Sequence, residues 1–174
     1  MKTLVVVDMQ NDFITGSLGS LEAQVIVPDV LYRVAQAIEN GDRIIFTRDT
    51  HGEDYLSTPE GIKLPVEHCI MLTDGWEIIP ELQSLVKGIP CTYINKPIFG
   101  SVGLMDYFSN SEEHEIEFCG VCTDICVVSN ALMAKSYFPK AKISVNPKCC
   151  AGTSINNHLS AIDVMRSCQI DIIE

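Results

Sequence analysis

The 174-residue sequence predicts an α/β fold: a doubly wound, mostly parallel six-stranded sheet with helices on both faces, in a Rossmann-like three-layer arrangement. One observation is that short apolar runs alternate with segments of helical periodicity along the chain. Another is that Thr3–Val7 is a continuous apolar run, typical of a strand buried on both faces of a parallel sheet. With 47% hydrophobic residues, we expect one domain over residues 1–174 with a substantial core.

The individual elements follow from these runs and from their boundaries. Strands are predicted as short apolar segments, and helices as apolar stripes at three- to four-residue spacing, with proline or serine near their starts. The predicted strands are 3–7, 43–47, 91–95, 115–119, 142–146 and 169–173. The predicted helices are 28–39, 80–86, 101–108, 123–134 and 154–166. Segment 48–75 has little periodicity, and so long an irregular segment in a compact domain usually carries function.

Charge and cysteine content narrow the class of protein. A net charge of −11 disfavours nucleic acid or an anionic membrane as a partner. The apolar run at the N-terminus is too short for a signal peptide or a membrane span. Eight cysteines without an export signal indicate free thiols in a reducing compartment. We therefore expect a cytoplasmic protein with a small-molecule substrate, no nucleic-acid or membrane partner, and assembly into a homo-oligomer.

The stretch 118–134 reads as strand, sharp turn and helix. Gly120 breaks the strand, Thr123 and Asp124 provide a helix cap and an acidic first turn, and Cys126 falls in that turn. The backbone N–H groups and the helix dipole there stabilise a thiolate, which predicts a nucleophile. Two alternatives stay open: the cysteines pack as small apolar residues, or Cys119 and Cys122 form a C-x-x-C redox pair or metal half-site.

Three reactive side chains follow predicted strands. Asp8 comes after the first strand, Lys96 after the third and Cys126 just beyond the fourth, and ligands of such sheets bind at the carboxyl ends of the strands. Asp8 is suited to accept the thiol proton and to donate it to a leaving amine, and the charge of Lys96 favours both thiolate and carboxylate. Individually, Asp8 also reads as a solvated strand-end acid and Lys96 as a surface lysine. Together the three side chains predict acyl transfer.

Three motifs resemble the cysteine hydrolases of the isochorismatase-like superfamily, which includes nicotinamidases and N-carbamoylsarcosine amidohydrolases. They are Val-Val-Val-Asp-Met-Gln-Asn-Asp-Phe at 5–13, Asn-Lys-Pro-Ile-Phe-Gly-Ser at 95–101 and Gly-Val-Cys-Thr-Asp-Ile-Cys-Val at 120–127. They occur in the family's order, and the resemblance covers essentially the whole chain. It is strongest to the nicotinamidase/pyrazinamidase group.

The resemblance implies roles for residues in these motifs. It makes Asp8, Lys96 and Cys126 the catalytic triad, with Cys126 as the nucleophile. It also implies a cis peptide bond between Val121 and Cys122, with the N–H groups of Cys122 and Cys126 forming an oxyanion hole.

A second group of residues lies in the irregular segment. The resemblance to nicotinamidases implies a divalent metal ion held by Asp49, His51, Glu60 and His68. Glu67 competes with His68 for the last position, because Pro-Val-Glu-His departs from the family's usual Pro-Pro-His. These donor types suit zinc, iron or manganese and favour none of them. The alternative is that Asp49 and His51 cap a strand while Glu60 and His68 are solvated.

The expected reaction follows from the triad and the metal together. We expect hydrolysis of nicotinamide, and of pyrazinamide, to the acid and ammonia through a cysteine thioester. Phe13 and Ile125 are predicted to line the substrate pocket, and Trp76 either walls that pocket or anchors the loop. The alternatives are hydrolysis of a ureido or carbamoyl compound by another member of the superfamily, or a thiol redox or metal-handling protein.

Overall fold

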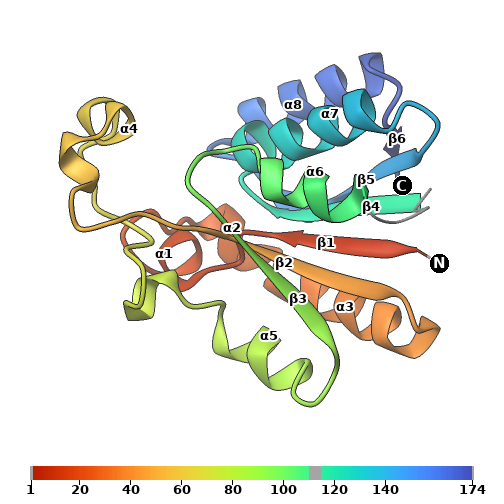
Figure 1. The fold of residues 1–174 in the computed structure, drawn as a ribbon, viewed down its shortest axis with the longest axis horizontal. Helices are drawn as coiled ribbons and strands as arrows, with labels where there is room; N and C mark the ends of the chain where they lie inside the picture. Colours follow the sequence, from red (N-terminus) through yellow and green to blue (C-terminus); the bar gives the residue numbers. More distant parts are fainter. Residues whose placement is uncertain (1, 110–114, 174) are drawn as a thin grey trace.

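The computed structural model describes residues 2–109 and 115–173, so Met1 and Glu174, the ends of the predicted domain, lie outside the described residues. Six strands form one sheet with the order β3-β2-β1-β4-β5-β6, and all neighbouring strands are parallel (Figure 1). The strands are β1 (Thr3–Val7), β2 (Arg43–Asp49), β3 (Cys91–Lys96), β4 (Glu115–Val121), β5 (Lys142–Ala151) and β6 (Asp171–Ile172). This order is that of doubly wound dinucleotide-binding folds, which confirms the predicted fold class.

Helices cover both faces of the sheet. The helices are α1 (Asn11–Ile14), α2 (Leu21–Val25), α3 (Val27–Asn40), α4 (Pro59–Lys63), α5 (Pro80–Leu85), α6 (Val102–Ser109), α7 (Val128–Tyr137) and α8 (Ile155–Ser167). Two 3₁₀ turns, η1 (Tyr55–Ser57) and η2 (Asp74–Trp76), and one π-helical turn, η3 (Thr123–Val127), complete the described elements. In Figure 1, α3 and α5 lie on one face and α6, α7 and α8 on the other, giving three layers. No helix among the described residues is both long and apolar enough to span a membrane.

The central strand and its flanking helix show why the sequence folds in this way. All five residues of β1 are fully buried, as its unbroken apolar sequence predicts. Helix α3 buries Val30, Val34 and Ala37 at helical spacing, and it ends at Gly41, whose φ of 69° forms a left-handed cap. These elements place the hydrophobic core on both sides of β1.

A buried ion pair crosses this core. The Glu117 carboxylate on β4 accepts two hydrogen bonds from the Arg33 guanidinium, at 2.8 and 3.0 Å. The Lys2 ammonium lies 2.6 Å from the same carboxylate, and the Glu117 side chain is only 1% exposed. Burial raises the pKa of Glu117, but the hydrogen bonds and charges of Arg33 and Lys2 outweigh burial and lower the pKa. The group therefore stays ionised inside the protein.

The structure differs from the sequence-based prediction in several boundaries. Helices α1 and α2 were not predicted, because four or five residues show too few turns for a periodic pattern. The irregular segment 48–75 contains the short helix α4 and the turns η1 and η2. Strand β5 runs five residues beyond the prediction, through Pro147, where the register with β4 shifts between Phe118 and Gly120. Such an irregularity tolerates a proline.

Candidate active site

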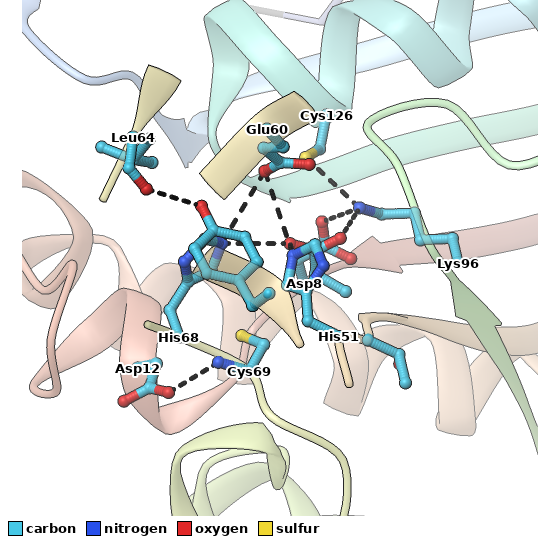
Figure 2. Close-up of polar contacts among 12 residues, drawn as sticks. Asp8, Asp12, His51, Glu60, Leu64, His68, Cys69, Lys96 and Cys126 are labelled. Atoms are coloured by element: carbon cyan, nitrogen blue, oxygen red, sulfur yellow. Dashed lines mark hydrogen bonds and ion pairs between the residues drawn. The ribbon is translucent and has the colours of Figure 1, made fainter. Parts of the chain in front are cut away.

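The predicted triad meets at the carboxyl ends of β1, β3 and β4. The Lys96 ammonium lies 2.7 Å from Oδ2 of Asp8 and 3.4 Å from Sγ of Cys126 (Figure 2). Strand β3 is two strands away from β1, roughly 10 Å at about 4.8 Å per strand, and the four-carbon stem of Lys96 crosses this gap. Asp8 and Lys96 are fully buried and Cys126 is 4% exposed, so the three groups interact largely out of water.

The Asp8 carboxylate is held in a fixed orientation. Its Oδ1 accepts a hydrogen bond from the Thr47 hydroxyl at 2.7 Å, and the Asp8 N–H donates to the same hydroxyl at 3.2 Å. Burial raises the pKa of Asp8, Lys96 opposes this rise and Asp49 adds to it. Asp8 is thus an unusually basic carboxylate, which suits a group that accepts a proton from a thiol.

The Cys126 thiol keeps its proton in the resting site. Burial and the negative charge of Asp8 raise its pKa well above the ordinary value, and Lys96 only partly opposes them. Lys96 thus favours the thiolate, as the sequence predicts, without generating it before substrate binds. Asp8 also hydrogen-bonds the thiol, so the proton has a direct path to the carboxylate.

The turn that carries Cys126 is wider than the predicted α-helical start. The carbonyl of Cys122 accepts a hydrogen bond at 3.1 Å from the N–H of Val127, five residues on, which is the spacing of a π-helix, and another at 3.1 Å from the Ile125 N–H. Thr123 and Asp124 provide no side-chain cap, contrary to the prediction, whereas Asp124 lies in the first turn as predicted. Their side chains instead form hydrogen bonds with other segments. The Thr123 hydroxyl bonds to His158 at 2.8 Å, and the Asp124 carboxylate accepts from Thr153 in the loop after β5. Single π turns occur frequently at functional sites.

Gly120 permits the close approach of β4 to β1. Its φ is 113°, and a Cβ at this position would lie 2.1 Å from the carbonyl oxygen of Val7, so a larger residue collides with main chain. The strand continues through Gly120 to Val121, whereas the sequence predicts a break there. The peptide bond between Val121 and Cys122 is cis, as the family resemblance implies.

Four predicted metal ligands converge beside the triad. Atoms of Asp49, His51, Glu60 and His68 that can bind a metal all lie within 4.8 Å of one another. Nε2 of His51 is 3.0 Å and Nε2 of His68 is 3.5 Å from Oδ2 of Asp49, and both Nε2 atoms are 3.9 Å from Oε1 of Glu60. His68, and not the exposed Glu67, occupies the last position.

The surroundings of the cluster suit a divalent cation. Nδ1 of His68 donates to the carbonyl of Val66 at 2.8 Å, which fixes the ring with Nε2 directed toward the cluster. Burial raises the pKa of Asp49, but the hydrogen bonds with His51 and His68 and the charge of Lys96 outweigh burial and lower the pKa, so the carboxylate is ionised. Two imidazoles and two carboxylates are donors for zinc, iron or manganese, and the donor set therefore fits the predicted ion.

One residue joins the cluster to the triad. Oδ2 of Asp49 faces the histidines, whereas Oδ1 accepts a hydrogen bond from the Lys96 ammonium at 3.1 Å. The same ammonium contacts Asp8 and Cys126, so the two groups of residues form one continuous polar network (Figure 2).

Cluster and nucleophile open into one cavity of about 540 Å³. Asp49, Glu60 and His68 line one part of it, and Cys122 and Cys126 line another. Its apolar walls include the side chains of Phe13, Leu64, Phe99 and Ile125. The two predicted pocket residues, Phe13 and Ile125, both lie here, together with Leu64 and Phe99, which the sequence analysis did not identify.

Comparison with known proteins identifies the family. The sequence matches the isochorismatase domain over residues 2–174. The chain belongs to the isochorismatase family. A nicotinamidase from Schizosaccharomyces pombe is 28% identical, with 98% of this chain and 91% of the relative covered.

Solved structures of isochorismatase-family proteins superpose closely on this chain. A nicotinamidase/pyrazinamidase from Bacillus subtilis has a TM-score of 0.90 at 26% identity, with both chains fully covered. A pyrazinamidase from Pyrococcus horikoshii in complex with zinc has a TM-score of 0.85 at 26% identity, covering 99% of this chain and 98% of the other. The resemblance stated from the sequence motifs is thereby confirmed.

Two aromatic residues of this isochorismatase-family chain stabilise the loop that carries the cluster without lining the cavity. Tyr55 is fully buried, its ring lies 4.7 Å from that of His51 and 4.9 Å from that of His68, and its hydroxyl donates to the carbonyl of Leu64 at 2.9 Å. Trp76 donates to the Thr50 hydroxyl at 2.8 Å and does not line the cavity, so it anchors the loop. The sequence analysis did not identify Tyr55, and the signal that could have done so is its position between the predicted ligands His51 and Glu60.

Proposed function

We propose that this chain hydrolyses nicotinamide, and pyrazinamide, to the corresponding acid and ammonia through a thioester on Cys126. Its family and its nicotinamidase relatives indicate an amidohydrolase acting on carbon–nitrogen bonds. The observation that supports the narrower proposal is the single cavity that both the Asp/His/Glu cluster and the Cys126 thiol line. A pyridine carboxamide has a ring nitrogen at one end and a carbonyl carbon at the other, which matches these two groups.

In the proposed mechanism, Asp8 accepts the Cys126 proton as sulfur attacks the carboxamide carbon. Lys96, 2.7 Å from Asp8 and 3.4 Å from the sulfur, balances the negative charge that moves between them. The backbone N–H groups of Cys122 and Cys126 are proposed to stabilise the oxyanion. Asp8 then gives the proton to the amide nitrogen, which leaves as ammonia when the C–N bond breaks. Asp8 next accepts a proton from the water that attacks the thioester, and it returns this proton to the Cys126 sulfur as the C–S bond breaks and the acid is released.

The cluster is proposed to orient the ring. Asp49, His51, Glu60 and His68 would hold a divalent metal ion, which supplies a Lewis-acidic position for the pyridine nitrogen. Phe13, 5.6 Å from the His68 ring, and Ile125 would pack on the ring within the cavity. Fixing the ring at one end aligns the carbonyl with the sulfur at the other, which favours attack.

The test compares nicotinamide with benzamide, which has the same carboxamide and lacks the ring nitrogen. Ammonia release from both is measured with zinc-loaded protein, chelator-treated protein and chelator-treated protein with zinc restored. We expect nicotinamide to be the far better substrate, KM for nicotinamide to rise on metal removal, and zinc to reverse that rise. Equal turnover of the two amides, or nicotinamide turnover independent of the metal, contradicts the ring-binding role. Ammonia release from a ureido compound alone contradicts the substrate assignment.

The expectations of a single domain over the whole chain, a cytoplasmic location and a homo-oligomer stay predictions. Size-exclusion chromatography with light scattering measures the last of these directly.

A further inference from the structure

A carboxylate outside both the triad and the cluster contacts the segment that carries His68. Asp12 lies on α1, and its Oδ2 accepts a hydrogen bond from the Cys69 N–H at 2.8 Å, as Figure 2 shows. Its Oδ1 accepts from the Ser17 N–H at 3.3 Å. At Gly75, a Cβ would lie 2.1 Å from Oδ2 of Asp12, so the turn η2 packs directly against the carboxylate. Three separate segments therefore meet at Asp12.

The main chain of Cys69 connects Asp12 to both histidines of the cluster. Its N–H is bonded to Asp12 and its carbonyl accepts from the His51 N–H at 3.0 Å. His68 immediately precedes Cys69, and the φ of Cys69, 48°, is in the left-handed region. A non-glycine residue holds that conformation only where surrounding contacts fix it. One peptide segment thus sets the positions of both imidazoles.

Neighbours of Asp12 fix the same segment residue by residue. The Ser17 hydroxyl donates to the carbonyl of Glu67 at 3.0 Å. The ring of Phe13 lies 5.6 Å from the ring of His68. Residues 12–17 therefore contact each of residues 67, 68 and 69. Among these contacts, the hydrogen bond from the Cys69 N–H to Asp12 is the one whose acceptor is a carboxylate. Charge-assisted hydrogen bonds of this kind are roughly twice as strong as neutral ones.

We propose that Asp12 is a positioning residue for the metal site, acting through the main chain of Cys69 to hold His51 and His68 in register. This inference rests on the proposed metal site and extends it to a residue that neither belongs to the ligand cluster nor lines the cavity. Its role is to set the affinity for the cation without touching cation, substrate or nucleophile. Outer-shell partners of metal ligands typically change affinity about 10- to 100-fold when they are removed.

The test measures zinc affinity of the full chain by competition with a chromophoric chelator. Asp12→Ala removes the acceptor, whereas Asp12→Asn keeps the shape and one oxygen acceptor without the charge. Asp54→Ala is the matched control, because Asp54 is an exposed acid of the same metal-binding loop and its side chain makes no capping hydrogen bond. We expect zinc affinity to fall about 10- to 100-fold in Asp12→Ala, less in Asp12→Asn, and not at all in Asp54→Ala.

Two further measurements separate positioning from general damage. KM for nicotinamide should rise in Asp12→Ala, whereas kcat, measured at saturating nicotinamide, should be unchanged. Alkylation of Cys126 should proceed at the wild-type rate. Unchanged zinc affinity in folded Asp12→Ala overturns the inference while leaving the proposed function intact. If Asp12→Ala does not fold, wild-type zinc affinity in Asp12→Asn overturns it and a reduced affinity supports it. A wild-type chain that binds no zinc overturns both this inference and the metal site on which it rests.

Discussion

Lys96 is the only lysine or arginine with an ion pair or hydrogen bond to the triad or the cluster among the described residues, so its removal tests the charge balance of the whole site. In an effective dielectric constant of about 20, a pair of unit charges attracts with about 6 kcal/mol at the 2.7 Å Lys96–Asp8 distance. At the 3.1 Å Lys96–Asp49 distance the attraction is about 5 kcal/mol. Lys96→Met keeps an unbranched side chain that is one heavy atom shorter, and it removes both attractions.

The loss of these attractions destabilises mainly the ionised form of Asp8. Burial and the neighbouring charge of Asp49 already raise the pKa of Asp8, and without Lys96 only the Thr47 hydrogen bond opposes them. Asp8 then enters the reaction protonated and cannot accept the thiol proton. We expect kcat for nicotinamide to fall about 10²- to 10⁴-fold, the usual contribution of a general base. Because the base works only when ionised, the acid limb of the pH–rate profile should shift to higher pH, and raising the pH should restore part of the activity.

The assay is ammonia release from nicotinamide across a pH series, for wild type, Lys96→Met and Lys148→Met. Lys148 is an exposed lysine of β5, so its replacement controls for the loss of one positive charge from the chain. Turnover of Lys96→Met within about tenfold of wild type, or an acid limb that does not move, would refute the charge-balance reasoning, since both effects follow from the same loss of attraction.

Two further predictions concern the thiol and the core. Cys126→Ala should abolish ammonia release and Cys122→Ala should retain much of it, with mass spectrometry placing an electrophilic substrate analogue on Cys126. Glu117→Gln should destabilise the fold by about 3–5 kcal/mol, roughly 10 °C in Tm, because it breaks a buried ion pair. The pKa of Glu117 is lowered in the folded state, so its contribution is full above the unfolded pKa of about 4.3 and is lost as pH falls through the folded value. The Tm difference from wild type should narrow in that acid range.

Matched variants decide these two outcomes. An adduct on Cys122, or turnover by Cys126→Ala, assigns the nucleophile elsewhere. For the core, Glu115→Gln is the control, because Glu115 lies on the same strand with its side chain 41% exposed and should contribute little. Equal Tm losses in the two glutamine variants, or a Glu117→Gln difference that is constant with pH, contradict the role assigned to the buried pair.

The sequence predicts the sheet and the triad well because both depend on strong local patterns. A strand buried on both faces, such as β1, has an unbroken apolar run, and the partly exposed edge strands β3 and β6 still contain short runs with apolar residues. All six strands were therefore identified, despite errors at their ends. The site residues Asp8 and Lys96 stand at the ends of two such runs, and parallel strands bring their carboxyl ends to one edge. Chain order and strand ends were therefore sufficient to bring these two residues together.

The metal-binding loop depends on contacts that no local pattern reveals. His51 and His68 are far apart in sequence, and they are brought together by main-chain bonds between residues 51 and 69–71 and by the Asp12 carboxylate. The short helices α1 and α4 that carry Asp12 and Glu60 are stabilised by packing, since isolated helices of this length do not persist in water. Family resemblance supplied the ligand set, whereas the supporting residues became visible only with the fold.

The choice between Glu67 and His68 shows how the main chain decides what sequence leaves open. The two residues are adjacent, and both have donor atoms for a divalent metal. The carbonyl of Glu67 is bonded to Ser17 and the N–H after His68 is bonded to Asp12, so the segment is fixed on both sides of the histidine. With the chain fixed in this way, the His68 side chain points to Asp49 and the Glu67 side chain is exposed. The polar contacts of residues 12–17 thus direct His68, and not Glu67, toward the cluster, although none of those residues belongs to the cluster.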